Sequence, residues 1–387
     1  MGEVPHGCPV TELDPWSDDV VADPWPTYRA LRDLGPVVWL ASHDMAALAR
    51  FDAVRAALTD HQRFSSASGV SADEARNLEM GETILSSDPP IHESHRRPLA
   101  TQLTPASLVP DLPHIEAIAD ALVERLVGVA SFDAVTEMAS PYSVNVVADL
   151  VGLPQEGREL IGPLGERAFN IMGPRDARNE DGGVALEQLM EYSVGTALSG
   201  QLCPGMRGAD LVAQGLAGAV AAYTWPGVDT TVHALGSAVL CFAENPDQWD
   251  LLRADPSLVP SAFNEVLRLH TPVQTFTRRT TESIDLDGVV LPAGQRVAVM
   301  FGSANRDERR YPDPDRFDVT RNPLDQLAFG RGIHLCVGIH LARAEAHSLF
   351  AALARRVRRF ELVGKPVWKL NNTLHGLASL PVRAVPA

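Results

Sequence analysis

The segment 209–243 constrains the fold of this chain most strongly, because it carries almost no charge. Its acidic residues are Asp210, near the start, and Asp229, and it contains no lysine or arginine. Its apolar spacing predicts one long helix of ~50 Å at about 1.5 Å per residue. A helix that is apolar on nearly all sides is stable only inside a protein. We therefore expect this helix to run through the centre of a mainly helical protein.

The rest of the chain also favours helices, with little strand. Apolar spacing of three and four predicts further helices at 23–35, 51–60, 92–103, 113–128, 139–152, 156–171, 245–255, 257–269 and 337–359. Strand-like runs predict a strand at 37–40 and a hairpin at 284–299. Polar or Pro/Asp-rich segments predict a loop at 65–85, a mobile connection at 173–183 and a meander at 305–328. We expect one domain over 1–387, with a helix-rich and a smaller β-rich part.

The composition narrows the functional classes. The chain has 387 residues, 45% of them hydrophobic, and a net charge of −16, which disfavours binding to nucleic acid or anionic membranes. No apolar run approaches the ~20 residues of a membrane span, and the acidic N-terminus is not a secretory signal. The four cysteines are far apart, which argues against a disulfide framework or a zinc knuckle. We expect a soluble, cytoplasmic protein with no nucleic-acid or membrane partner.

Cys336 has the most unusual surroundings, in the stretch FGRGIHLCVG at 329–338. Most free cysteines are simply buried small residues, and Cys336 has that alternative. It also precedes a predicted helix, whose unpaired N–H groups favour a thiolate. A catalytic thiol would take His334 as its base, whereas an ordinary metal site would need more ligands than the nearby sequence offers. The remaining alternative is a thiolate that is the sole protein ligand of a haem iron.

The pattern F-G-x-G-x-H-x-C-x-G, followed by IHLARAEA, resembles the haem-binding loop of the cytochrome P450 family. Further segments resemble the family in the same order, over roughly 15–385. The resemblance implies the cytochrome P450 fold, mainly α with small β-sheets, with haem between the long central helix and the helix after the cysteine. It implies that Cys336 ligates the iron of haem b (iron protoporphyrin IX), and that Phe329, Gly330 and Gly338 surround it.

A second segment, SDPPIHESHRR at 87–97, resembles the family's entrance to the helix beside the haem. The residues that fall on the family's haem-propionate partners are His92, Arg96, Arg278 and His334. Several donors around two carboxylates are chemically coherent, because a buried carboxylate needs paired hydrogen bonds. For a single arginine considered alone, a solvated surface charge is the ordinary alternative.

Glu265 and Arg268 lie three residues apart in NEVLRL, and resemble the family's E-x-x-R pair. Such pairs are mostly exposed and contribute little to stability when considered alone. PDPDRF at 312–317 resembles the family's P-x-R-F, which implies that Arg316 completes a Glu–Arg–Arg cluster. The implied role is structural, since a bidentate guanidinium–carboxylate pair can hold the meander beneath the haem.

TWPGVDTT at 224–231 lies within the long apolar segment and resembles the family's A/G-G-x-D/E-T-T. The resemblance implies that Asp229 and Thr230 deliver protons during the reductive cleavage of dioxygen. Cleaving the O–O bond heterolytically takes two protons in a site that otherwise excludes water. The alternative for Asp229 is a buried acid satisfied by an arginine or by backbone donors. Pro226 departs from the family's small residue, and we expect it to kink the helix because it has no N–H group.

The resemblance implies a monooxygenase that inserts one oxygen atom from O2 into an organic substrate. A chain of 387 residues leaves no room for a fused reductase, so NAD(P)H-derived electrons are expected from a separate ferredoxin-type partner. The cationic residues expected to meet that partner, on the cysteine side of the haem, are Arg96, Arg97, Arg331 and Arg343.

The substrate is expected to be compact and partly aromatic, by analogy with the family's pocket. The residues expected to line that pocket are Trp225, Pro226, Gly227, Phe169, Met172, Val273 and Phe276. Three short segments, SSASGV, FNIMGP and GVDTTV, resemble members that oxidise para-substituted benzoates. Arg76 or a serine at 65–71 would then hold a carboxylate, the alternative being that Arg76 is solvated. Tailoring of a bacterial secondary metabolite is an equally open interpretation.

Two other classes of function remain open. One is a haem-thiolate enzyme that does not activate O2, such as a peroxide-driven peroxygenase or an isomerase, and the other is a haem sensor or carrier. The presence of both Asp229 and Thr230 argues against the first class. The same pair and the predicted buried pocket argue against the second class. Sustained product formation with NADH and a ferredoxin system would separate the monooxygenase from both.

Overall fold

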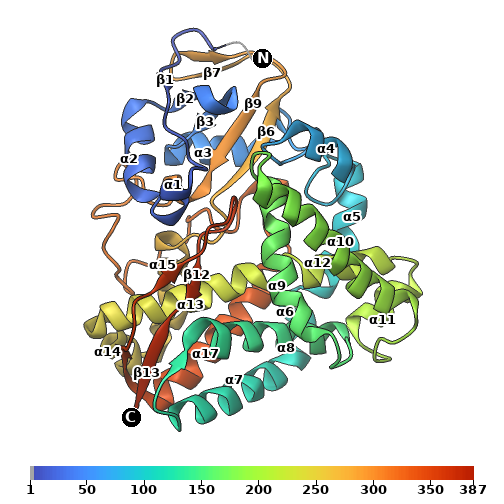
Figure 1. Ribbon diagram of the computed structural model, residues 1–387, viewed down its shortest axis with the longest axis vertical. Helices are drawn as coiled ribbons and strands as arrows, with labels where there is room; N and C mark the ends of the chain where they lie inside the picture. Colours follow the sequence, from blue (N-terminus) through green and yellow to red (C-terminus); the bar gives the residue numbers. More distant parts are fainter. Residues whose placement is uncertain (1–3) are drawn as a thin grey trace.

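The computed structural model describes residues 4–387 and has a β-rich part and a larger helical part. In Figure 1 the β-rich part lies at the top, near the N-terminus, and the helical part fills the middle and bottom. The C-terminus lies at the bottom, at the end of strand β13. The mainly helical architecture agrees with the helix-rich and β-rich parts expected from the sequence.

One six-stranded sheet organises the β-rich part, with strand order β1-β2-β3-β9-β6-β4. Its strands are β1 (Val10–Thr11), β2 (Val37–Leu40), β3 (Met45–Leu48), β4 (Phe64–Ser65), β6 (Thr275–Thr280) and β9 (Arg296–Met300). All residues of β2, β3 and β9 are buried, as expected for strands covered on both faces. Phe276 and Arg278 of β6 are two residues apart and therefore point to the same face. That face borders the cavity described below.

Short helices and a hairpin surround this sheet. The helices are α1 (Asp18–Ala22), α2 (Trp25–Leu34), α3 (Phe51–Thr59) and α16 (Phe301–Ala304). The expected hairpin at 284–299 is shorter than predicted, with β7 (Ile284–Leu286) paired to β8 (Val289–Leu291). The remainder of that segment forms β9, which pairs with β3 and β6 instead. The strand pattern was correct, and only the partner of the last strand differed.

The helical part follows the predicted order of helices. It contains α4 (Glu74–Met80), α5 (Ile91–Gln102), α6 (Pro105–Leu108), α7 (Leu112–Val127), α8 (Ser140–Val151), α9 (Arg158–Ala168), α10 (Ala177–Leu198), α11 (Arg207–Ala213), α12 (Ala221–Thr224), α13 (Asp229–Glu244), α14 (Pro246–Ala254), α15 (Val259–Leu269) and α17 (Ile339–Arg356). A π-helical turn at Ala134–Ala139 precedes α8. Two small sheets complete this part. One consists of β10 (Val357–Leu362), β13 (Pro381–Pro386) and β5 (Phe132–Asp133), and the other of β11 (Val367–Trp368) and β12 (Leu377–Ser379).

Helix α13 occupies the centre, as its composition predicts. Of its 16 residues, 13 are buried, and it crosses the helical part beside α15 and α17 (Figure 1). The expectation of one continuous helix over 209–243 is wrong, because α11, a 3₁₀ turn at Ala217–Val220, α12 and α13 are separate pieces. The interruptions fall at Gly215, in a left-handed conformation, and at Pro226, which lacks an N–H group.

Two segments expected to lack structure contain helices. The predicted loop at 65–85 includes α4, whose N-cap Asp73 accepts hydrogen bonds from two backbone N–H groups. The predicted connection at 173–183 includes the start of α10, capped in the same way by Asp176. In both cases an N-capping aspartate stabilises a helix start in a polar segment, where apolar periodicity gives no signal.

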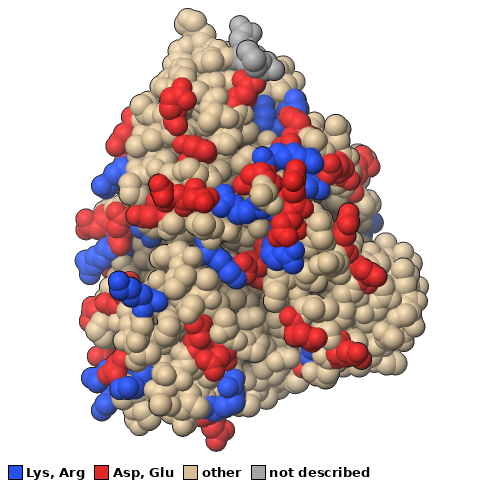
Figure 2. Space-filling model, in the orientation of Figure 1, with Lys and Arg blue, Asp and Glu red and all other residues tan. Residues whose placement is uncertain are grey.

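The surface fits the charge expected from composition. On the face in Figure 2, acidic and basic side chains are intermixed rather than gathered into a basic field. Over residues 4–387, no helix has the length and apolar character needed to cross a membrane.

Candidate active site

Cys336 lies between a 3₁₀ turn and the start of α17. Gly330 and Gly332 both have a φ of 68°, a left-handed conformation that a side chain would strain. A Cβ atom on Gly332 would also lie 2.5 Å from the carbonyl oxygen of Leu58, so the loop packs directly on α3. The backbone N–H of Cys336 donates to the carbonyl of Phe329 at 2.8 Å. The glycines therefore permit the tight turn that presents the thiol.

Burial raises the pKa of the Cys336 thiol, while the backbone N–H of Gly338 and the charge of Arg96 oppose that shift. Burial thus opposes the thiolate that the start of α17 favours. A thiolate at Cys336 needs a further positive charge, which a coordinated metal ion supplies. Across residues 4–387, no group of three or more His, Cys, Asp or Glu residues is placed to hold a metal ion alone. The site suits a metal that arrives within a cofactor.

A cavity of about 640 Å³ separates Cys336 from the break between α12 and α13. From the cysteine loop, its lining includes the predicted cofactor contacts Phe329, Gly330 and Gly338. From the break, its lining includes Trp225, Pro226, Gly227 and Thr230. The cavity thus joins the two segments whose motifs the sequence singled out, although they are about 100 positions apart in the chain.

The four predicted propionate partners form one cluster at the edge of this cavity. Helix α5 places His92 and Arg96 one turn apart, so both side chains lie on the same helix face. The rings of His92 and His334 lie edge to face with centroids 4.4 Å apart. Arg96, Arg278 and His334 line the cavity, and Arg96 Nη2 donates to the carbonyl of Leu335 at 2.6 Å. Three separate segments therefore converge, as the sequence predicted.

The electrostatics of this cluster favour anions. Burial, and then the charges of Arg278 and its neighbours in the cluster, lower the pKa of His334 to about 3. Burial and the charge of Arg96 also lower the pKa of His92. The Nε2 atoms of His92 and His334 are buried and lack hydrogen-bond partners. Unpaired donors that repel one another are stabilised by carboxylates, so these residues fit a haem and its two propionates.

Pro226 and Thr230 shape the wall opposite the thiol. The hydroxyl of Thr230 donates to the carbonyl of Pro226 at 3.0 Å, across the start of α13. A Cβ atom on Gly227 would lie 2.3 Å from the carbonyl oxygen of Tyr223, so the break is tightly folded. The predicted kink at Pro226 is confirmed, since α12 ends at Thr224 and α13 begins only at Asp229. The break leaves the Thr230 hydroxyl on the cavity wall.

Asp229 is buried, with 4% of its surface exposed, and it does not line the cavity. Its carboxyl group faces α9, because a Cβ atom on Gly165 would lie 2.1 Å from Oδ2. Oδ2 has no hydrogen-bond partner, and burial raises the pKa of this carboxyl well above its usual value. Burial therefore favours the protonated form of Asp229, one residue from the threonine that borders the cavity.

The predicted Glu–Arg–Arg cluster exists, but its third member is different. Both oxygens of Glu265 accept hydrogen bonds from Arg268, at 2.7 and 2.9 Å, and both side chains are fully buried. Arg321 Nε donates to Glu265 at 3.0 Å, and this bond occupies the place expected for Arg316. The side chain of Arg316 is 65% exposed and lies 3.9 Å from Asp318.

The reason lies in the backbone at Arg316. Its carbonyl, not its side chain, faces the cluster and accepts a bond from Arg268 at 3.3 Å. Arg321 also donates to the carbonyls of Pro312 and Asp313, at 2.8 and 3.1 Å. The cluster therefore ties the meander to α15 mainly through backbone carbonyls.

Most of the predicted pocket residues line the cavity. They are Trp225, Pro226, Gly227, Phe169, Val273 and Phe276. Met172 does not line it and packs behind it, with Val70 and Ile171. Arg76 is a wrong prediction, because it does not line the cavity either. It pairs with Glu79 at 2.6 Å and donates to Asn179 at 3.1 Å, so it ties α4 to α10.

Several cavity residues were missed by sequence analysis. They include Met190 of α10, and Leu216, Ala219 and Ala222 before the break. Met80 and Leu85 also line the cavity, from the predicted loop at 65–85. The helical spacing of EARNLEM was a usable signal for α4, whereas nothing in the sequence shows which face of α10 turns inward.

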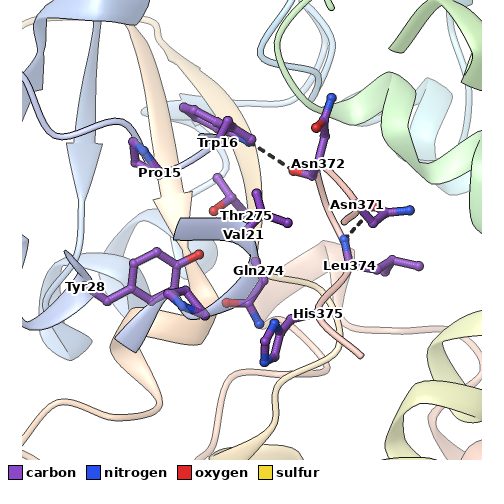
Figure 3. Close-up of a pocket in the computed structure, with 11 residues that line it drawn as sticks. Pro15, Trp16, Val21, Tyr28, Gln274, Thr275, Asn371, Asn372, Leu374 and His375 are labelled. Carbon is purple, nitrogen blue, oxygen red and sulfur yellow. Dashed lines mark hydrogen bonds between the residues drawn. The ribbon is translucent and has the colours of Figure 1, made fainter. Parts of the chain in front are cut away.

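A second cavity, shown in Figure 3, holds about 20 Å³ and lies apart from the cysteine. It is lined by Trp16 and Tyr28 near the N-terminus, by Gln274, and by residues 371–375. Trp16 Nε1 donates to the carbonyl of Asn372 at 3.0 Å beside it. This space suits one water molecule and no organic substrate. Leu374, expected in the substrate pocket, borders this small cavity instead.

Comparison with known proteins agrees with the geometry. A family model described as Cytochrome P450 matches residues 206–385. Cytochrome p450 CYP199A2 of Rhodopseudomonas palustris is 38% identical, covering 98% of this chain and 96% of the relative. Cytochrome P450 monooxygenase PikC of Streptomyces venezuelae is 32% identical, covering 97% and 94%.

Solved structures agree as well. The structure of CalO2 is similar with a TM-score of 0.83, at 30% identity, covering 97% of this chain and 99% of that one. P450BioI in complex with a fatty-acyl carrier protein has a TM-score of 0.85 at 24% identity, and shows the shared fold. The predicted fold is confirmed. The chain belongs to the cytochrome P450 family and is a haem monooxygenase.

Proposed function

We propose that this monooxygenase inserts one oxygen atom from O2 into a small aromatic or secondary-metabolite substrate, by hydroxylation or O-demethylation. One observation supports this most strongly. Cys336, the cationic cluster of His92, Arg96, Arg278 and His334, and the Thr230 hydroxyl all lie around one cavity. Such a reaction requires three elements from the protein: a thiol, a binding site for two carboxylates and a proton donor.

In this proposal Cys336 would ligate the iron of haem b, and the cationic cluster would hold its propionates. When bound, haem supplies the redox-active iron, and thiolate donation favours cleavage of O2. Phe329 borders the cavity next to the thiol, and the guanidinium of Arg343 lies 5.7 Å from the centre of its ring. The aromatic ring shields the sulfur from water, which keeps its ligand field strong.

Proton delivery is assigned to Asp229 and Thr230. The Thr230 hydroxyl borders the cavity and donates to Pro226 at rest, so it can turn to donate to a substrate-side acceptor. Burial favours the protonated form of Asp229, which faces α9 rather than the cavity. A side-chain rotation or a bridging water would connect the two. Aspartate thus serves as the proton store and threonine as the donor at the cavity wall.

Electrons are assigned to a separate ferredoxin-type partner. Arg97 is exposed beside Arg96 on α5, and Arg331 and Arg343 are partly exposed around the cysteine loop. These four cations form a local positive surface in a protein of net charge −16, which suits an acidic redox protein. A cytoplasmic location stays a prediction.

The test compares product formation by the haem-loaded protein with two reagents, an NADH-dependent ferredoxin system and hydrogen peroxide. Sustained product formation with NADH, a ferredoxin and its reductase supports the monooxygenase, and Thr230→Ala should then consume NADH with little product. Product only when hydrogen peroxide is added would favour a peroxygenase. Haem uptake without product from either system would favour a sensor or carrier.

A further inference from the structure

We infer that the cavity accepts electrically neutral, largely apolar substrates and discriminates against organic anions. This inference rests on the proposed function, and it names the class of substrate. It departs from the benzoate-oxidising members that three short segments of the chain resemble.

The wall away from the cysteine loop is largely apolar, although the polar residues Thr83, Ser94, His95 and Thr231 also line the cavity. Its main contributors are Val70, Met80, Leu85, Phe169, Met190, Trp225, Val273 and Phe276. They come from both sides of the cavity, from the segment around α4 to the start of β6. Apolar and aromatic walls bind neutral molecules by burying them, and give a charged group no partner.

The only arginines that line the cavity, within residues 4–387, are Arg96 and Arg278. Both belong to the cationic cluster with His334. Arg96 Nη2 donates to the carbonyl of Leu335, and Arg278 Nη1 donates to that of Thr277 at 2.8 Å. If haem propionates occupy this cluster, both charges are neutralised, and no lysine or arginine remains to hold a substrate carboxylate.

The candidate carboxylate anchors of the benzoate hypothesis are committed elsewhere. Arg76 is held by Glu79 and Asn179, and a Cβ atom on Gly183 would lie 2.9 Å from its Nη2. Ser71 donates to the carbonyl of Ile171 at 2.7 Å. The remaining serines of 65–71 do not line the cavity either.

The one carboxylate that lines the cavity, among the described residues, adds to the discrimination. Glu82 is exposed and lies two residues after α4, so it is placed at the rim rather than the interior. An anion that approaches past Glu82 meets a like charge and then an apolar wall. A neutral molecule of the same shape is not repelled by Glu82 and brings no charge to the apolar wall.

The test uses probes that attach themselves to haem, so the natural substrate need not be known. 4-(Imidazol-1-yl)benzoate and its methyl ester share one ring system, and in both the free imidazole nitrogen binds iron. Binding is read from the shift of the Soret band of the holoprotein at pH 7.4. We expect the ester to bind at least about 100-fold more tightly than the acid, by analogy with buried charges left unpaired. Equal or tighter binding of the acid would overturn the inference, and so would no shift with either probe.

Two arginine substitutions separate the cavity from the overall charge. Leu85→Arg places a cation on the cavity lining. It should reduce the ratio of the dissociation constant of the acid to that of the ester by at least about tenfold. Leu78→Arg adds the same charge on α4, at a side chain 85% exposed and outside the cavity. The ratio should be unchanged in this control. If Leu78→Arg narrows it as much, the discrimination comes from net charge and the inference is wrong.

The same samples report on the proposed function independently. Reduction under carbon monoxide shows whether the haem has a thiolate ligand, whatever the probes do. A sample without that signature would refute the proposed function. A sample with it, in which acid and ester bind alike, would refute only the assignment of a neutral substrate.

Discussion

Replacement of Arg321, compared with Arg316, tests the structure where it contradicts the sequence pattern most sharply. Arg321 is 17% exposed and donates to Glu265 at 3.0 Å. It also bonds to the backbone carbonyls of Pro312 and Asp313. Arg316 is 65% exposed, and its nearest carboxylate, on Asp318, is 3.9 Å away. The two arginines are five positions apart and carry the same charge, so they form a matched pair.

The magnitudes follow from what each substitution leaves unpaired. Arg321→Ala removes one of two cations from a fully buried carboxylate, which keeps both bonds from Arg268. We expect the free energy of unfolding to fall by about 2–4 kcal/mol. This range lies between the typical effect of losing a buried hydrogen bond and that of breaking a buried ion pair. Arg316→Ala should change it by less than about 0.5 kcal/mol, as for other exposed charges.

The assay is urea unfolding of the apoprotein, followed by far-ultraviolet circular dichroism. A second readout is the rate at which the holoprotein releases haem to a scavenger, because the meander precedes the cysteine loop. Arg321→Ala should accelerate haem release, and Arg316→Ala should not. Equal losses in the two variants, or a larger loss for Arg316→Ala, would refute the assignment of Arg321 to the cluster.

Three further predictions concern the loop, the acid and the buried histidines. Gly332→Ala should lower the free energy of unfolding by about 1–3 kcal/mol and weaken haem retention, because the φ of Gly332 is 68° and an added Cβ would meet a backbone oxygen. The control variant Gly195→Ala should not destabilise the protein, because no atom lies close to the position of the added Cβ. Asp229→Asn should lower the amount of product formed per NADH without reducing apoprotein stability, because burial favours the neutral acid, which asparagine resembles in shape and charge; a destabilised variant would contradict this. Burial lowers the pKa of His375 to about 3 and the pKa of His233 to about 4 in the folded protein. As the pH falls below 6.5, these two histidines therefore become protonated in the unfolded chain before they do so in the folded protein. Unfolding free energy should then fall by up to ~1.4 kcal/mol per pH unit per histidine between about pH 6.5 and 4. His375→Phe should reduce that slope in urea titrations at several pH values, and an unchanged slope would contradict the buried neutral imidazole.

The sequence predicted the site best where one helix or one loop carries the residues. His92 and Arg96 are four positions apart on α5, and Cys336 with its glycines forms a contiguous loop, so local geometry places them. Arg278 was predicted from the family resemblance, and the structure places it on strand β6, on the same face as Phe276 and on the cavity wall. Patterns of period 2 and 3.6 carry that information directly.

Residues in irregular segments were harder to place. Nothing local shows that Arg316 turns outward and that Arg321 reaches Glu265, because the meander has no periodicity and follows its tertiary contacts. Arg76 failed similarly, since its orientation depends on α10, which apolar spacing did not reveal. The break before α13 was predicted only as a kink at Pro226, yet the segment loses four helical residues there.

The most direct test of the account is the absorption spectrum of the haem-loaded protein, reduced and exposed to carbon monoxide. The account predicts a strongly red-shifted Soret band typical of a thiolate ligand. Cys336→Ser should lose that band, whereas replacement of Cys8, Cys203 or Cys241 should keep it. A band at shorter wavelength in the intact protein, typical of an imidazole or a neutral thiol, would contradict the assignment of Cys336 as the axial thiolate.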